Sequence, residues 1–95
     1  MNNNLIDWIV LDSRKINKIG YFKGNLYVEY QNKGGYFKKE EIIYEYLDVP
    51  ERIYRSILNK DCLSRDANQP SHGATLYDLV EKNQQYRFNK IIVKI

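Results

Sequence analysis

Short stretches of alternating apolar and polar residues, separated by glycine-containing turns, run through the first half of the chain. Residues 26–30 (Leu-Tyr-Val-Glu-Tyr) follow the period of a half-buried β-strand. Residues 16–22 and 36–47 predict two further strands, the second of them broken or bulged in its charged part. Turns are predicted at 22–25 and 32–35, because glycine and asparagine tolerate positive φ. Together these signals predict an antiparallel meander.

An amphipathic helix is predicted directly after the third strand. Pro50 suits the first turn of a helix, where a missing N–H costs nothing, and Glu51 favours the positive end of the helix dipole. Apolar residues then recur on one face up to about Lys60, namely Ile53, Tyr54, Ile57 and Leu58. We expect this helix to cover one side of the sheet.

Beyond this helix the pattern weakens. Residues 61–73 are polar and predict a loop that is long for so small a domain. Thr75 followed by Asp78 resembles a capping box, which predicts a second, short helix ending near Lys82. The last residues, 91–95 (Ile-Ile-Val-Lys-Ile), predict a strand, because four of the five are β-branched.

Two features near the start of the chain complete the predicted fold. Residues 8–11 (Trp-Ile-Val-Leu) predict a strand or an extended segment packed on the core. Gly20, inside a predicted strand, indicates a bulge or a close backbone approach. The prediction is a single α+β domain over residues 1–95. It is a small antiparallel meander of three to four strands packed against one main helix, with an inserted loop and short helix.

Composition narrows the class of protein. Ninety-five residues with 43% apolar content fit one globular domain rather than a disordered tail. The single cysteine excludes an intramolecular disulfide and predicts a reducing compartment. The sequence shows neither the pattern of a signal peptide nor a stretch that approaches the ~20 apolar residues of a membrane span. We therefore expect a cytoplasmic protein without a membrane partner.

Charge is unevenly distributed along the chain. The net charge of +3 is by itself too small to argue for nucleic acid. Residues 13–39 nevertheless carry seven basic residues and one acidic residue, whereas residues 40–81 carry four basic and nine acidic residues. A dipolar surface or ordinary solvated faces would both give this pattern.

Several of these segments resemble a known family. The strands Ile-Asn-Lys-Ile-Gly-Tyr (16–21) and Leu-Tyr-Val-Glu-Tyr (26–30) are followed by Tyr44-Glu45-Tyr46 and by Val49-Pro50, which leads into a helix. This arrangement resembles the KTSC domain, found at the C-terminus of some lysyl-tRNA synthetases and as small stand-alone bacterial and phage proteins. Its hallmark is Tyr-x-Tyr followed by Val-Pro, here Tyr44, Tyr46 and Pro50.

The resemblance covers residues 13–60 and resumes within 85–95, where Tyr-Arg-Phe-Asn-Lys-Ile (86–91) looks like the family's ending. The chain departs from the family at about 61–84, where it inserts a loop and a short helix. The resemblance implies RNA binding, through the synthetase context of the family. The sheet pattern adds that lysines interleaved with tyrosines can neutralise phosphates and stack bases.

Against this stand acidic residues next to the tyrosine pair, because Glu45 and Asp48 repel a nucleic-acid backbone there. Tyr44 and Tyr46 lining the core under the helix fits the pattern equally well. In that case the stretch 42–50 is the hinge that fixes helix on sheet, and the ligand contacts lie on the basic strands and the inserted loop.

A nucleotide-derived small molecule is the alternative ligand. Aromatic rings can sandwich a base while arginines hold phosphates, which would suit a bacterial or phage protein that sequesters such a molecule in a counter-defence role. A homo-oligomeric interaction domain that pairs through residues 91–95 is a further alternative. The candidate ligand-binding residues are Lys18, Tyr21, Lys23, Tyr27, Lys38, Arg52, Arg55, Arg65 and Arg87.

An enzyme is not expected. Cys62 and His72 lie ten residues apart in the polar segment, and a Cys/His dyad requires only that they meet in space. One cysteine and one histidine without a local signature carry little weight. They also cannot complete a metal site without carboxylates. The sequence therefore predicts a non-catalytic binding module without a cofactor or metal.

Overall fold

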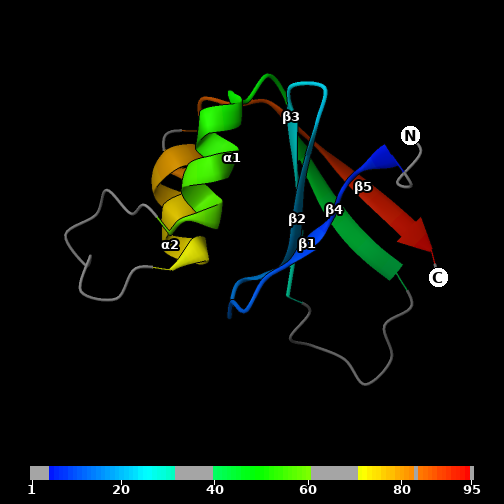
Figure 1. Cartoon of the computed structure of the whole chain (residues 1–95). Coiled ribbons are helices and arrows are strands. Elements are labelled where there is room, and N and C mark those ends of the chain that lie inside the picture. The colour runs from blue at the N-terminus through cyan, green and yellow to red at the C-terminus, as the bar shows by residue number, and fades with distance from the viewer. Residues whose placement is uncertain (1–4, 32–39, 61–70, 83, 95) are drawn as a thin grey trace.

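The computed structural model describes residues 5–31, 40–60, 71–82 and 84–94. Over these residues the chain forms a five-stranded antiparallel sheet with helices on one face (Figure 1). The elements are β1 (Ile9–Val10), β2 (Ile16–Phe22), β3 (Asn25–Tyr30), β4 (Glu40–Tyr46), α1 (Glu51–Leu58), α2 (His72–Leu76), η2 (Tyr77–Glu81) and β5 (Phe88–Lys94). This is the predicted α+β class. The sheet has five strands where three to four were predicted, because Ile9–Val10 also pairs with β2.

The strands lie in the sheet in the order in which they occur along the chain, β1-β2-β3-β4-β5, so the predicted meander is confirmed. The turn between β2 and β3 has positive φ at both central residues, 50° at Lys23 and 82° at Gly24. Two such residues twist the chain in the sense that a tight hairpin requires. The turn predicted at 32–35 and the start of the predicted third strand lie outside the described residues.

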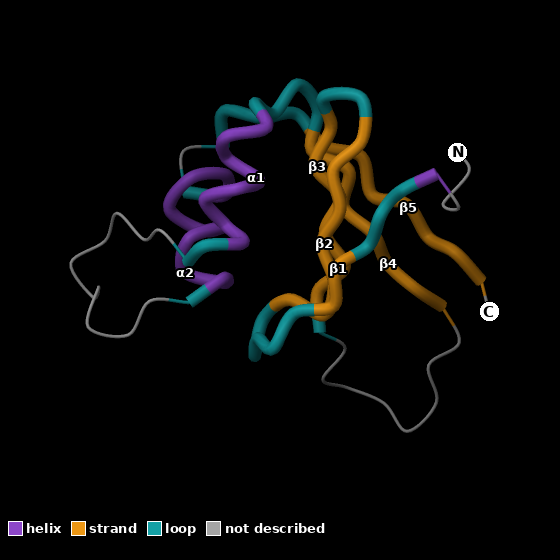
Figure 2. Tube along the Cα trace, in the orientation of Figure 1, coloured by secondary structure: helices purple, strands orange, loops and turns teal. Residues whose placement is uncertain are grey.

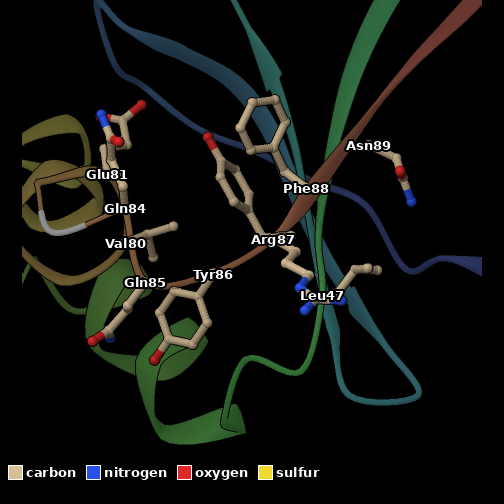
Figure 3. A pocket seen from close by; sticks show the side chains of 10 residues that line it. Leu47, Val80, Glu81, Gln84, Gln85, Tyr86, Arg87, Phe88 and Asn89 are labelled. Carbon is tan, nitrogen blue, oxygen red and sulfur yellow. The ribbon is translucent and has the colours of Figure 1, made fainter.

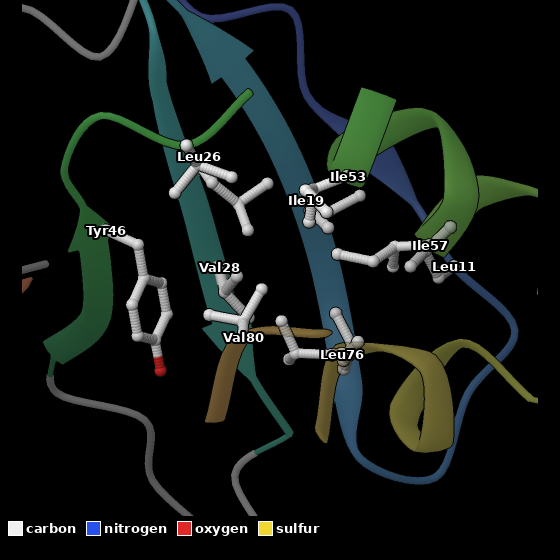
Figure 4. Packing of buried hydrophobic residues seen from close by; sticks show 11 residues of the cluster. Leu11, Ile19, Leu26, Val28, Tyr46, Ile53, Ile57, Leu76 and Val80 are labelled. Carbon is white, nitrogen blue, oxygen red and sulfur yellow. The ribbon is translucent and has the colours of Figure 1, made fainter. Parts of the chain in front are cut away.

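The larger core lies between the sheet and the helices, which the tube in Figure 2 shows on one side of the strands. Its buried aliphatic side chains come from every layer, as Figure 4 shows: Ile19, Leu26, Val28, Ile53, Ile57, Leu76 and Val80. Ile16 joins the same core although it lies three residues from Ile19, because a register shift between Ile16 and Lys18 resets the alternation of β2. Burying each such side chain stabilises the fold by roughly 1.5–3 kcal/mol.

A smaller core covers the opposite face of the sheet. Tyr27 and Ile43 are buried there under Ile6, and Trp8 packs beside them with its ring edge-on to Tyr27. The chain before β1 approaches β2 so closely that a Cβ on Gly20 would lie 2.4 Å from the Ile6 Cγ2 atom. Of the two expectations for Gly20, the close approach is therefore confirmed.

The connection from β4 to α1 is anchored on the β2–β3 hairpin. The Val49 N–H donates to the Gly24 carbonyl at 2.9 Å, and the Asp48 N–H donates to the Asn25 Oδ1 atom at 3.2 Å. Pro50 occupies the N-cap position with φ −59°, one residue before the predicted first turn. The helix ends at Leu58, close to the predicted end.

Tyr44 and Tyr46 both point to the helix side of the sheet. Tyr46 is buried in the larger core, and Tyr44 packs half-buried against it. Ile43, which lies between them in β4, belongs to the core on the opposite face. The tyrosine pair is therefore part of the packing under the helices.

The cap of the second helix lies four residues before the predicted one. The Ser71 side chain accepts the Ala74 N–H at 3.0 Å and caps α2, whereas the Thr75 hydroxyl donates to the Ser71 carbonyl at 2.8 Å inside the helix. The predicted capping box at Thr75 is thus wrong, and so is the predicted loop over His72 and Gly73. His72 is buried, with its Nδ1 atom 2.7 Å from the Ile57 carbonyl of α1.

The helix continues as the π-helical segment η2 and ends near the predicted residue. Its wider turn is closed by the Lys82 N–H, which donates to the Tyr77 carbonyl at 2.8 Å. The terminal strand β5 begins at Phe88, earlier than predicted, and pairs residue by residue with the whole of β4. Among the described helices, none has the length and apolar character needed to cross a membrane.

Candidate functional site

A groove of about 1150 Å³ lies between η2, the connection after it and the start of β5. Val80 and Glu81 form its helical side, residues 84–89 form its other side, and Tyr46 and Leu47 of the adjoining strand end complete it (Figure 3). Pockets of about 300–1,000 Å³ hold drug-sized ligands, so the volume is sufficient for a small molecule.

Aromatic rings form one wall of the groove. The Phe88 side chain is 54% exposed, although it is large and apolar. Its ring stacks on Tyr44 with 5.5 Å between centroids and 22° between planes, and it lies 5.7 Å from the Tyr46 ring. Tyr44 in turn meets Tyr30 edge-on at 5.2 Å. The exposed ring is therefore held in place by buried neighbours.

A chain of hydrogen bonds runs from the aromatic wall to the helical side. The Tyr30 hydroxyl donates to the Glu81 Oε2 atom at 2.5 Å, and the Tyr46 hydroxyl lies 2.8 Å from the Tyr30 hydroxyl. A phenol has only one proton. Because Tyr30 uses its proton on the carboxylate, Tyr46 must donate to Tyr30.

The other carboxylate oxygen of Glu81 pairs with the Lys15 ammonium group. Lys15 also lies over the rings of Tyr30 and Tyr77, at 6.0 and 5.6 Å from their centroids. Its stem packs against α2, where a Cβ on Gly73 would lie 3.0 Å from the Lys15 Cβ atom. The close helix approach and the ion pair together fix the position of Glu81.

Burial keeps the phenol groups of Tyr30 and Tyr46 neutral. It raises the pKa of Tyr30 far above its usual range, and the hydrogen bond to Glu81 adds to the effect. Burial also raises the pKa of Tyr46. The direction of the hydrogen bonds, from Tyr46 through Tyr30 to Glu81, is therefore the same throughout the neutral pH range.

Most of the sequence-predicted site residues lie away from this groove. Tyr21 stacks on Tyr54 of α1 at 5.4 Å, and Tyr27 is 3% exposed with its hydroxyl donating to Glu45 at 2.8 Å. Tyr27 is therefore closed to a base, and Tyr54 covers one face of the Tyr21 ring. Lys18, on the far face of the sheet, lies 4.6 Å from the centre of the Trp8 ring.

The remaining basic candidates are dispersed. Lys23 lies in the β2–β3 turn, and Arg52 and Arg55 lie on the exposed side of α1, with Arg55 paired to Glu51 at 2.5 Å. Lys38 and Arg65 are outside the described residues. Arg87 alone among the described candidates lines the groove, next to Phe88 in the chain.

Sequence reasoning missed the residues that shape the groove. Lys15 and Tyr30 are 66 and 51 positions from Glu81, so no local spacing joins them. Phe88 carried one usable signal, because a large aromatic residue follows a polar stretch at the start of a strand. The Tyr-x-Tyr motif identified the strand that adjoins the groove. Its two tyrosines, however, have a packing role there.

Of the Cys/His pair considered for catalysis, the structure describes only His72. His72 lies at the start of α2 and is bonded to the Ile57 carbonyl, while Cys62 is outside the described residues. In the described part of the chain, no group of three or more His, Cys, Asp or Glu side chains is placed to hold a metal ion.

Comparisons of the chain with protein-family models, with curated proteins and with solved structures found no match. The resemblance to the KTSC domain therefore depends on the residues quoted for it. Of these, Tyr44 and Tyr46 lie at the end of β4 on its helix side, and Pro50 occupies the N-cap position of α1.

Proposed function

We propose that the protein is a non-catalytic binding module that holds a nucleobase-containing small molecule in the groove between η2 and β5. The observation that carries this proposal is the exposed ring of Phe88, which is supported from behind by Tyr44 and Tyr46. Stacking of a base on an aromatic side chain is worth about 1–3 kcal/mol and needs an open ring face held in a fixed orientation.

Polar side chains around the ring suit the rest of such a ligand. Gln84 and Gln85 line the groove and carry amides that both donate and accept hydrogen bonds. Arg87 is exposed and adjacent to Phe88, where a guanidinium group can pair with a phosphate of the ligand. A nucleotide contains both of the groups that these residues recognise.

Isothermal titration calorimetry with a panel of nucleoside monophosphates tests the proposal. Phe88→Ala should weaken binding about tenfold or more, since one stacked base is lost. Ile92→Ala is the matched control, because Ile92 is on the same strand and similarly exposed, at 52%, but does not line the groove. The proposal fails if no nucleotide binds, or if both variants bind as the parent does.

RNA is the second candidate ligand, in line with the resemblance to the KTSC domain. It is favoured by the exposed Lys90, which lies two residues after Phe88 in β5, opposite Tyr44, and adds a second cation beside the aromatic wall. Each phosphate contact to a single strand steepens the salt dependence of the logarithm of affinity by about 0.7. An affinity for short oligonucleotides that falls steeply with salt, with no binding of mononucleotides, would favour RNA.

A homo-oligomeric role is the third candidate. β5 is a terminal strand of the described sheet, so its outer edge carries backbone groups without a strand partner there. Pairing of β5 with β5 of a second copy would extend the sheet. Sedimentation equilibrium of the chain and of an Ile92→Pro variant distinguishes this, because proline at an edge blocks strand addition.

A further inference from the structure

The fixed polar atoms that the helical side presents to the groove are hydrogen-bond acceptors. The Glu81 carboxylate has about four lone-pair sites, of which Lys15 and Tyr30 occupy one on each oxygen. Among the described residues, one site per oxygen is therefore left without a partner beside the groove. Since Tyr46 donates its only proton to Tyr30, its oxygen has only acceptor capacity left.

The charge of this acceptor set is already balanced. Lys15 forms an ion pair with the same carboxylate, so a cationic ligand would have to compete with a tethered ammonium group. Neutral N–H donors meet no such competition, and a hydrogen bond from a neutral donor to a carboxylate is stronger than one to an uncharged oxygen. The site therefore favours a neutral donor edge.

The spacing of the two open sites on one carboxylate selects among the bases. Guanine presents two neighbouring donors, the N1–H and the N2 amino group, to a bidentate acceptor. Adenine and cytosine place a ring acceptor beside their amino group, and uracil places its imino group between two carbonyls. These edges would bring acceptors against Glu81, and a buried unpaired acceptor is unfavourable.

We infer that the groove is selective for guanine nucleotides, with Glu81 reading the N1–H and N2 amino edge while Phe88 stacks on the ring. This inference rests on the proposed function, because it assigns the ligand class of the same groove. Lys15 and Tyr30 act as positioning residues that fix the carboxylate, and Tyr46 fixes Tyr30.

The decisive experiment compares GMP with IMP, which lacks only the N2 amino group. Calorimetry on the full chain should give an affinity for GMP at least about tenfold above that for IMP, because one charge-assisted hydrogen bond is lost. AMP and UMP should bind more weakly than IMP. Glu81→Gln replaces one acceptor with a donor and should abolish the preference for GMP over IMP.

A second variant separates recognition from folding. Glu81→Gln also disturbs the contacts to Lys15 and Tyr30, so its melting temperature is measured beside that of Tyr21→Phe, which removes a part-buried hydrogen bond to the Val49 carbonyl away from the groove. Tyr21→Phe should retain the preference for GMP even if it lowers the melting temperature. Loss of the preference in both variants would mean that it follows stability, which overturns the role of Glu81.

The outcomes distinguish this inference from the proposed function. If no mononucleotide binds, both fail. If nucleotides bind and Phe88→Ala weakens them, but GMP and IMP bind equally, the proposed function stands and the inferred selectivity is wrong. Retention of the GMP preference in Glu81→Gln would likewise overturn only the role assigned to the carboxylate.

Discussion

The Tyr21 hydroxyl donates a hydrogen bond to the Val49 carbonyl, with 2.5 Å between the two oxygens. Tyr21 belongs to β2, and Val49 lies just before the cap of α1, so this bond connects the sheet to the entry of the helix. The Tyr21 ring also stacks on Tyr54 of α1. One side chain thus determines both where the helix starts and how it lies on the sheet.

Removal of that hydroxyl should lower stability without disturbing the fold. Tyr21→Phe keeps the stacked ring but leaves the Val49 carbonyl without this donor, and we expect the free energy of unfolding to fall by about 1 kcal/mol. Urea denaturation followed by fluorescence measures it. Tyr77→Phe is the control, because Tyr77 is 50% exposed, and its stability should not change. Equal losses in the two variants would contradict the role of the bond.

The cap of α2 gives a second prediction. Ser71→Ala removes the acceptor of the Ala74 N–H and should cost about 1 kcal/mol of unfolding free energy. Ser71→Gly should cost only a few tenths of a kcal/mol, because glycine at an N-cap leaves the first N–H groups open to water. Thermal denaturation of both variants checks this. A larger loss for glycine than for alanine would show that Ser71 does not act as the cap.

The accuracy of the sequence predictions follows the range of the interactions involved. The Lys23-Gly24 turn and the buried face of α1 depend on neighbouring residues and were predicted correctly. The start of α2 was not, because Ser71 and Thr75 are both good capping residues four positions apart. The contact between His72 and α1 shows which of them the packed structure uses.

The candidate site depends almost entirely on long-range contacts. The partners of Glu81 come from β3 and from Lys15, just before β2, more than fifty positions away, and no periodicity in the sequence reports such a meeting. The basic and tyrosine residues chosen from the pattern were individually reasonable. The tyrosine rings are used for packing, however, because both faces of a small sheet must be covered to form a core.

The contact between Gly20 and Ile6 can be tested with a double-mutant cycle. Gly20→Ala places a methyl group where the Ile6 side chain lies, and we expect a loss of about 1–3 kcal/mol from overpacking. Ile6→Ala opens the same space, so the double variant should lose less than the sum of the two single losses. Additive losses in urea denaturation would indicate that the two side chains do not compete for this space.

Alkaline pH should destabilise the protein through its buried tyrosines. The folded state holds the pKa of Tyr30 and Tyr46 above the unfolded value of roughly 10, so it resists their ionisation. Stability from this source is complete below about pH 10 and is lost as the pH rises beyond it. Tyr30→Phe should be less stable at neutral pH but lose less between pH 9 and pH 11.

Chemical denaturation at a series of pH values measures this dependence. Tyr77→Phe, at an exposed site, should keep the steep alkaline loss of the parent chain. If the stability of the parent stays flat above pH 10, or if Tyr30→Phe follows the same curve, the raised pKa of Tyr30 does not govern the alkaline limit.

The wide turn of η2 has a consequence for how this chain tolerates change. In a π-helical turn one extra residue fits between hydrogen-bonded partners, here Tyr77 and Lys82. Deleting one residue between these partners would let the segment close as an ordinary α-helical turn, with the residues beyond it near their present directions. An inserted residue has no second wide turn to take it up, so it would rotate Glu81 by about 100° away from Tyr30 and Lys15. The segment therefore tolerates a deletion better than an insertion, and its length is as informative as its composition when related chains are aligned.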